Sequence, residues 1–154
     1  MAEKDSKPIV EADDSSKRAI IEALKGDNTY GFDVESIYYL EKEDKWIIYE
    51  FLKCDHPTVR PRESHPKRYW FNWRKFASLW RLKLMLNAEL FLINYEDLEH
   101  ARMQKRVERE YTIIRVLDMN PTHDGGILSE EITNLDFDGF SDWFRNMNNR
   151  GKSK

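Results

Sequence analysis

A single acidic residue stands inside one of the most apolar segments of this sequence. Glu50 interrupts the run Ile47-Ile-Tyr-Glu-Phe-Leu52, a pattern typical of a β-strand that is covered on both faces. Burying a carboxylate costs free energy unless a cation or a metal ion pairs with it. The sequence therefore marks Glu50 as a candidate functional residue.

Asp33 is the acid that we expect to lie beside Glu50. Segments 32–40 and 46–54 are rich in β-branched and aromatic residues, and the charged stretch 41–45 between them predicts a hairpin. The midpoint between positions 33 and 50 falls inside that loop, which predicts that the two carboxylates are neighbours. Close carboxylates resist joint ionisation. A hard divalent cation such as Mg²⁺, or Mn²⁺ in its place, would relieve the conflict between them.

Two lysines could place a positively charged ammonium group beside these acids. Lys53 follows Glu50 by three positions, so in a regular strand the two side chains point to opposite faces. A β-bulge between them would return Lys53 to the Glu50 side. Lys75, near the start of the next predicted helix, is the alternative, and we favour Lys53 because a bulge is only a local change. A third interpretation is that Glu50 pairs with Arg68 or Arg74 and does no chemistry.

The order of these elements resembles that of a known nuclease family. With a first helix, the acidic hairpin, a second helix and an apolar strand, residues 15–95 resemble the PD-(D/E)XK, restriction-endonuclease-like nuclease superfamily. The resemblance implies that Asp33 and Glu50 bind Mg²⁺ and that Lys53 positions the water that attacks a DNA phosphodiester. It also implies that Glu22, on the first helix, completes the metal site. The chain departs from the family in having two residues, not one, between its acid and its lysine.

The middle of the chain carries most of the excess positive charge. Segment 53–83 holds nine Lys and Arg against two acids, for a net charge of +7, while the rest of the chain has −10. Such asymmetry favours an anionic partner, and we expect nucleic-acid contacts from Arg60, Arg62, His65, Lys67, Arg68 and Lys75. Six aromatic residues fall between positions 69 and 80. Helical spacing predicts that Trp73, Phe76 and Trp80 are core residues, whereas Tyr69 and Trp70 are freer to stack on unpaired bases.

Hydrophobic periodicity predicts an α/β fold. We expect a mixed sheet of four or five strands flanked by helices, a restriction-endonuclease-like core, with the third strand parallel to the second. The predicted domain covers residues 15–147, between disordered tails at 1–14 and 148–154. The predicted helices are 15–25, 68–87, 140–147 and a short exposed helix within 96–110. The predicted strands are 32–40, 46–54, 89–95, 111–119 and 132–137.

Composition limits the functional class. A chain of 154 residues with 13% aromatic residues can form one folded domain. Its single cysteine excludes an intrachain disulfide and a multi-cysteine zinc site. The sequence has no apolar stretch of membrane-spanning length and no signal-peptide pattern, which favours the cytoplasm. The leading interpretation is a Mg²⁺-dependent nuclease acting on DNA. The alternatives are a catalytically inactive nucleic-acid-binding module on the same fold and an oligomeric interaction protein such as a homodimer.

Overall fold

A computed structural model of the chain describes residue 12 and residues 14–32 and 34–152. The chain divides into two compact units, residues 1–33 and residues 34–154, and the predicted domain of residues 15–147 spans the boundary between them. The described part of the first unit contains helix α1 (Ser15–Leu24), which ends where Lys25 adopts a left-handed conformation ahead of Gly26. No residue of α1 is buried. In the described part of the chain, every helix is too short or too polar to cross a membrane.

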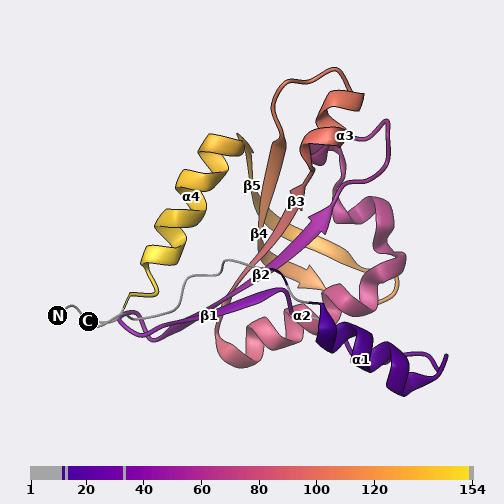
Figure 1. Cartoon of the computed structure of the whole chain (residues 1–154). Helices are drawn as coiled ribbons and strands as arrows, with labels where there is room; N and C mark the ends of the chain where they lie inside the picture. The colour runs from indigo at the N-terminus through magenta and orange to yellow at the C-terminus, as the bar shows by residue number, and fades with distance from the viewer. Residues whose placement is uncertain (1–11, 13, 33, 153–154) are drawn as a thin grey trace. The chain divides into compact units, whose positions relative to one another are not determined.

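The second unit is built on a five-stranded mixed sheet (Figure 1). Its strands are β1 (Ser36–Leu40), β2 (Lys45–Lys53), β3 (Glu89–Tyr95), β4 (Glu110–Asn120) and β5 (Gly126–Asp136). They lie side by side in chain order; β2 and β3 are parallel, and the other neighbours are antiparallel. The helical segments are η1 (Pro61–Glu63), η2 (Pro66–Asn72), α2 (Trp73–Leu86), α3 (Leu98–Met103) and α4 (Phe137–Asn149). The α/β class, the mixed sheet and the parallel pairing of its second and third strands are therefore confirmed.

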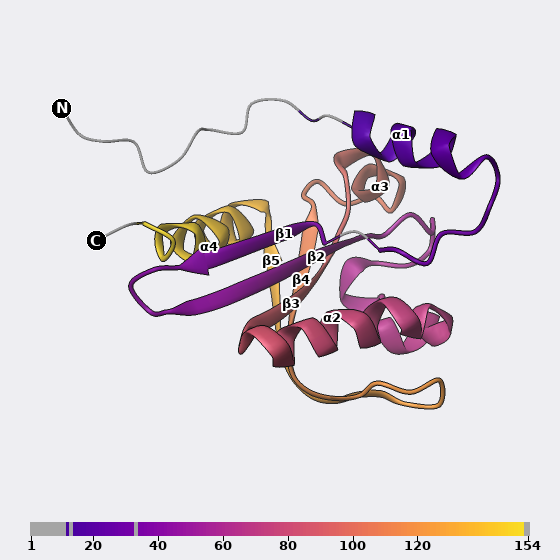
Figure 2. The same cartoon turned by 90° about the horizontal axis from the view of Figure 1, so that it is seen from below.

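Helices cover both faces of the sheet, as Figure 2 shows for α2 and α4. Because side chains alternate along a strand, β2 supplies residues to both faces. On the α2 side, the core contains Ile48, Phe76, Leu79, Trp80, Leu90, Leu92 and Ile114. On the α4 side, Phe140, Trp143, Phe144 and Met147 pack against Ile47, Tyr49, Phe91 and Ile93. The apolar run of β2 is thus buried on two sides, as its composition predicts.

The helix expected at 68–87 begins later than predicted. Residues 66–72 form a 3₁₀ segment with a non-helical backbone at Tyr69 (φ −133°, ψ 41°), and α2 begins at Trp73. The kink allows Tyr69 and Trp70 to pack against the α2-side core. Near the other end of the helix, Leu84 continues the helical spacing of Phe76 and Trp80 but is exposed. A short-range apolar pattern therefore identified the helix but not its first turn or its last buried residue.

The C-terminal part of the chain is more ordered than the sequence indicates. β5 is eleven residues long, not six, because this edge strand is mostly exposed and its polar residues weaken the strand pattern. The predicted tail from residue 148 is wrong at its start, because α4 continues to Asn149. Arg150 then pairs with Glu43 at 2.8 Å and with Glu89 at 3.0 Å. The last two residues, 153–154, and the predicted tail at 1–11 and 13 lie outside the described residues.

Candidate functional site

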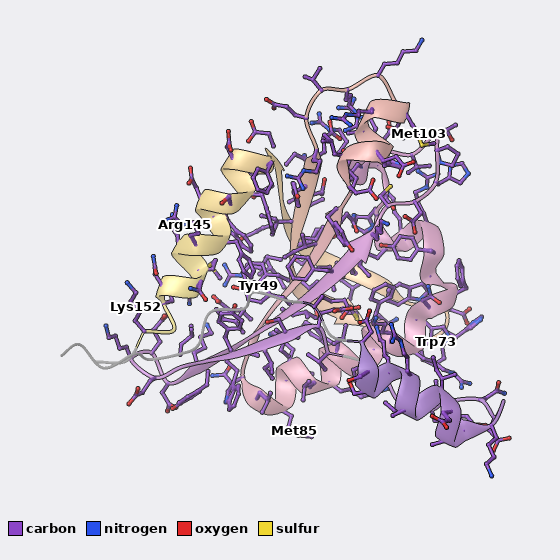
Figure 3. All side chains as sticks on the ribbon, viewed as in Figure 1. Tyr49, Trp73, Met85, Met103, Arg145 and Lys152 are labelled. Carbon is purple, nitrogen blue, oxygen red and sulfur yellow. The ribbon has the colours of Figure 1, made fainter. Side chains whose placement is uncertain are left out.

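Glu50 is completely buried in the middle of the sheet. Its side chain has 0% exposure, and its β3 neighbour in the parallel register is Leu92. Tyr49, labelled in Figure 3, packs on the α4 side, so Glu50 points to the α2 side with Ile48. A carboxylate in this position has lost its water and needs a partner inside the protein.

Lys75 supplies that partner. Its ammonium forms an ion pair with Oε1 of Glu50, and it comes from the first turn of α2, with the lysine side chain 34% exposed. Neither Glu50 oxygen accepts a hydrogen bond of ordinary geometry from the described residues. Burial raises the pKa of Glu50, and the charge of Lys75 opposes this rise without cancelling it. The carboxylate is therefore only partly compensated.

A second acid, Glu35, lies beside Glu50 at the start of β1. The register pairs Ser36 with Tyr49, so the preceding position on β1 lies opposite Glu50. Glu35 is exposed, and its negative charge contributes to the raised pKa of Glu50. Sequence reasoning proposed Asp33 for this place, and Asp33 lies outside the described residues.

The position of the turn explains the difference between Glu35 and Asp33. The turn that joins β1 to β2 occupies Glu41–Asp44. Its centre lies one residue later in the chain than the midpoint between positions 33 and 50. Because the two strands run in opposite directions, moving the turn centre by one residue moves the cross-strand partner by two. The signal that could have found Glu35 is the exact length of the turn, which the charged stretch 41–45 leaves open.

Lys53 does not reach the Glu50 carboxylate. β2 pairs with β3 in an unbroken register through Glu50 and Lys53, so the predicted β-bulge is wrong. The Lys53 ammonium instead lies 3.3 Å from Asp97 and 3.5 Å from Asp55, and Asp97 is the main cause of its raised pKa. The lysine that reaches Glu50 is Lys75, from the following helix.

The expected metal ligands are only partly visible. Glu22 lies on α1, in the first unit, and Asp33 is not described. Among the described residues, no group of three His, Cys, Asp or Glu side chains is arranged to hold a metal ion. The buried oxygens of Glu50 nevertheless fit a hard divalent cation, because they are anionic oxygen ligands whose burial Lys75 only partly compensates.

Most of the cations expected to contact nucleic acid are paired with acids. Arg60 and Arg62 both pair with Glu110, the latter at 3.2 Å, and His65 Nε2 lies 2.7 Å from Glu130. Lys67 and Arg68 are exposed, and Arg68 donates a hydrogen bond to the backbone oxygen of Glu63 at 3.0 Å. Tertiary contacts thus neutralise part of the positive charge that the sequence places in this segment.

The aromatic residue that is free to stack differs from the expected ones. Tyr69 and Trp70 face inward: the Trp70 ring stacks on Phe76 at 5.7 Å, and the Tyr69 hydroxyl donates to Asn94 at 3.3 Å. Phe71, by contrast, is 81% exposed. No periodicity in the sequence separates Phe71 from its neighbours, because the 3₁₀ segment rather than an α-helix decides which ring points outward.

Comparison with known proteins adds no relative to these observations: no protein-family model, curated protein sequence or solved structure matches this chain.

Proposed function

We propose that this protein is a Mg²⁺-dependent nuclease that hydrolyses DNA phosphodiester bonds at a site centred on Glu50. The observation that carries the proposal is the buried Glu50 carboxylate, whose one ion-pair partner in the described part of the chain is the Lys75 ammonium. Buried carboxylates with a perturbed pKa are concentrated at functional sites. The order of α1, β1, β2, α2 and β3 also agrees with the nuclease superfamily that the sequence resembles.

Each residue has a defined part in this proposal. Glu50 and Glu35, the acid directly before β1, supply anionic oxygens for the cation. A divalent cation would stabilise the charge that develops on the phosphate during attack by water. Lys75 takes the place that the family gives to the lysine of its acid-x-Lys motif: its ammonium is next to Glu50 and its side chain is one-third exposed, so it can orient a water molecule.

A cleavage assay tests the proposal. We expect the parent protein to cleave labelled DNA with Mg²⁺ or Mn²⁺ and to be inactive in EDTA. Glu50→Gln and Lys75→Met should each reduce the cleavage rate by about 100-fold or more, because each removes a charged group from the reacting centre. Lys53→Met is the matched control and should cleave like the parent, since Lys53 pairs with Asp55 and Asp97.

Two results would contradict this function. One is a parent protein that never cleaves single-stranded, double-stranded or branched DNA with either metal. The other is full activity in the Glu50 and Lys75 variants, which circular dichroism must show to be folded.

A second candidate function is nucleic-acid binding without catalysis. It is favoured by the exposed cations of η2 and α2, Lys67, Arg68, Arg74 and Arg81, which form no ion pair with the described acids. In this case the Glu50–Lys75 pair is structural, and binding persists in EDTA while cleavage is absent with every metal.

A further inference from the structure

Segments η2 and α2 carry exposed cations on both sides of an exposed aromatic residue in the sequence. Phe71 is 81% exposed, and the flanking Lys67, Arg68, Arg74 and Arg81 are also exposed. None of these four cations forms an ion pair with a carboxylate in the described part of the chain. We call these five residues the α2 ridge.

The geometry of α2 places two cations of the ridge on one face. Arg74 and Arg81 are seven positions apart, which is about two turns and roughly 10 Å along the helix, on the same side. Phe76, Ala77, Leu79 and Trp80 are buried against the sheet, so Arg74 and Arg81 lie on the outer face of the helix. Figure 3 labels Trp73 and Met85 near the two ends of this helix. The Arg74 guanidinium lies 5.7 Å from the Trp73 ring centre, at the start of α2.

The ridge combines the two elements that bind unpaired nucleotides. Cations attract backbone phosphates, and an exposed ring offers a surface on which a base can stack. In a duplex the base faces are already stacked, so an exposed phenylalanine has no partner there. An acidic protein partner would use the cations but not the ring. The chemistry of the ridge therefore fits a flexible polyanion with accessible aromatic faces.

We infer that the α2 ridge binds single-stranded nucleic acid, with one unpaired base stacked on Phe71 and the backbone phosphates along Arg74 and Arg81. The inference rests on the proposed function for the class of ligand and adds that the substrate is single-stranded at the site. Arg74 directly precedes Lys75, whose ammonium contacts Glu50, so the ridge and the proposed reacting centre are both built on the first turn of α2.

Binding is measured on the full chain in EDTA, where cleavage cannot interfere. The probes are fluorescent twelve-nucleotide oligo-dT and oligo-U and a blunt DNA duplex of the same length, followed by anisotropy at several salt concentrations. We expect both single strands to bind more tightly than the duplex. The logarithm of the binding constant falls linearly with the logarithm of the salt concentration. This slope should become less steep by about 0.7 when Arg74→Gln removes one phosphate contact.

Variants of the ridge separate stacking from charge. Phe71→Ala should weaken single-strand binding by about 5- to 100-fold without changing the salt slope, and Phe71→Tyr should restore it. The matched controls are Arg145→Gln, an exposed arginine on α4 (Figure 3), and Leu128→Ala, an exposed apolar residue on β5. Both controls should bind like the parent.

Three results would overturn the inference: no binding of the single strands, equal or tighter binding of the duplex, or unchanged binding by Phe71→Ala. These results are independent of catalysis. If the protein binds single strands through Phe71 but never cleaves them, the inference about the α2 ridge stands and the nuclease proposal fails. If the protein cleaves DNA and Phe71→Ala changes nothing, the nuclease proposal stands and the inference about the ridge fails.

Discussion

At the scale of single residues, Glu96 shows how this fold satisfies a buried carboxylate completely. Glu96 is 1% exposed, and it pairs with the Arg106 guanidinium and with His100 Nδ1 at 2.6 Å. The backbone N–H of Glu110 donates a further hydrogen bond to it at 2.8 Å. Burial alone would raise the pKa of Glu96, but these partners together lower it.

Glu50 is equally buried and has much less support. Its pKa is raised, because burial outweighs the single ammonium of Lys75. The contrast with Glu96 indicates that the fold is able to saturate a buried carboxylate and does not do so at Glu50. Partial compensation leaves Glu50 with capacity for another ligand, which is the physical basis of the proposed function.

His100 is held in its charged form by acceptors on both sides of its ring. Nδ1 faces Glu96, and Nε2 lies 2.8 Å from the backbone oxygen of His56. An imidazole can donate from both nitrogens only when it is protonated. Burial lowers the pKa of His100, but the two acceptors outweigh this and raise it above the ordinary value of 6.5. The short helix predicted within 96–110 is present as α3, but the same stretch also contains a buried network around Glu96 and His100.

We predict that His100 makes the stability of the protein depend on pH. Its contribution is fully present below pH 6.5 and is lost as the pH rises through the raised folded pKa. The lowered pKa of Glu96 has the opposite sense: its contribution is present above pH 4.5 and is lost on acidification. The network should therefore stabilise the fold most between these two values.

Urea unfolding of His100→Gln at pH 6 and pH 9 checks this prediction. At pH 6 the substitution should lower the free energy of unfolding by about 1.5–3 kcal/mol, because it removes a charge-assisted hydrogen bond to a buried acid. The loss should be smaller at pH 9. His123→Gln, at an exposed position, is the control. An equal loss at both pH values would show that His100 acts only through packing.

At the scale of elements, the β4–β5 hairpin fixes the position of η2. Trp70 Nε1 donates to the backbone oxygen of Thr122 at 3.1 Å, and His65 pairs with Glu130 on β5. The Trp73 ring also meets His123 edge-on. The far end of the hairpin is thus attached to the 3₁₀ segment whose conformation turns Phe71 outward.

The tight turn of this hairpin requires a glycine at position 125. A Cβ at Gly125 would overlap the backbone oxygen of Asn120, whereas nothing lies within 4 Å of one at Gly126. We predict that Gly125→Ala lowers the free energy of unfolding by about 1–3 kcal/mol, measured by urea denaturation. Gly126→Ala, the matched control, should be neutral or stabilising by up to about 1 kcal/mol. Equal effects of the two substitutions would contradict the steric argument.

At the scale of the whole molecule, the two units differ in how much core they contain. The two hydrophobic clusters are made of residues from 34 onwards, while α1 has no buried residue. Helices without a packed face contribute little to stability in water. The sheet and its covering helices should therefore fold without the first unit.

We predict that a truncated chain beginning at Val34 unfolds cooperatively, with a Tm within about 4 °C of the full chain, or roughly 1 kcal/mol. Thermal unfolding followed by circular dichroism measures this. A chain ending at Asp136, which loses α4 and its aromatic contacts with Tyr49 and Phe91, is the control and should lose its cooperative transition. A truncation at Val34 that fails to fold would contradict the assignment of the core to the second unit.

The sequence by itself determined the elements and the identity of the buried acid. The range predicted for the third strand, 89–95, is that of β3, because an apolar run of this length with a turn before it depends only on neighbouring residues. The burial of Glu50 followed in the same way from the apolar residues on both sides of it.

The tertiary structure decided which charges meet. Glu35 lies beside Glu50 because the turn is centred one residue later than the sequence predicts, which moves the cross-strand partner by two residues. Lys75 pairs with Glu50 in place of Lys53 because β2 has no bulge and α2 packs over the face to which Glu50 points. The +7 segment also has part of its charge paired with Glu110, which is far from it in the sequence, and with Glu50, which is just before it. Local patterns carry no information on such pairs, since these depend on how the packed elements bring distant side chains together.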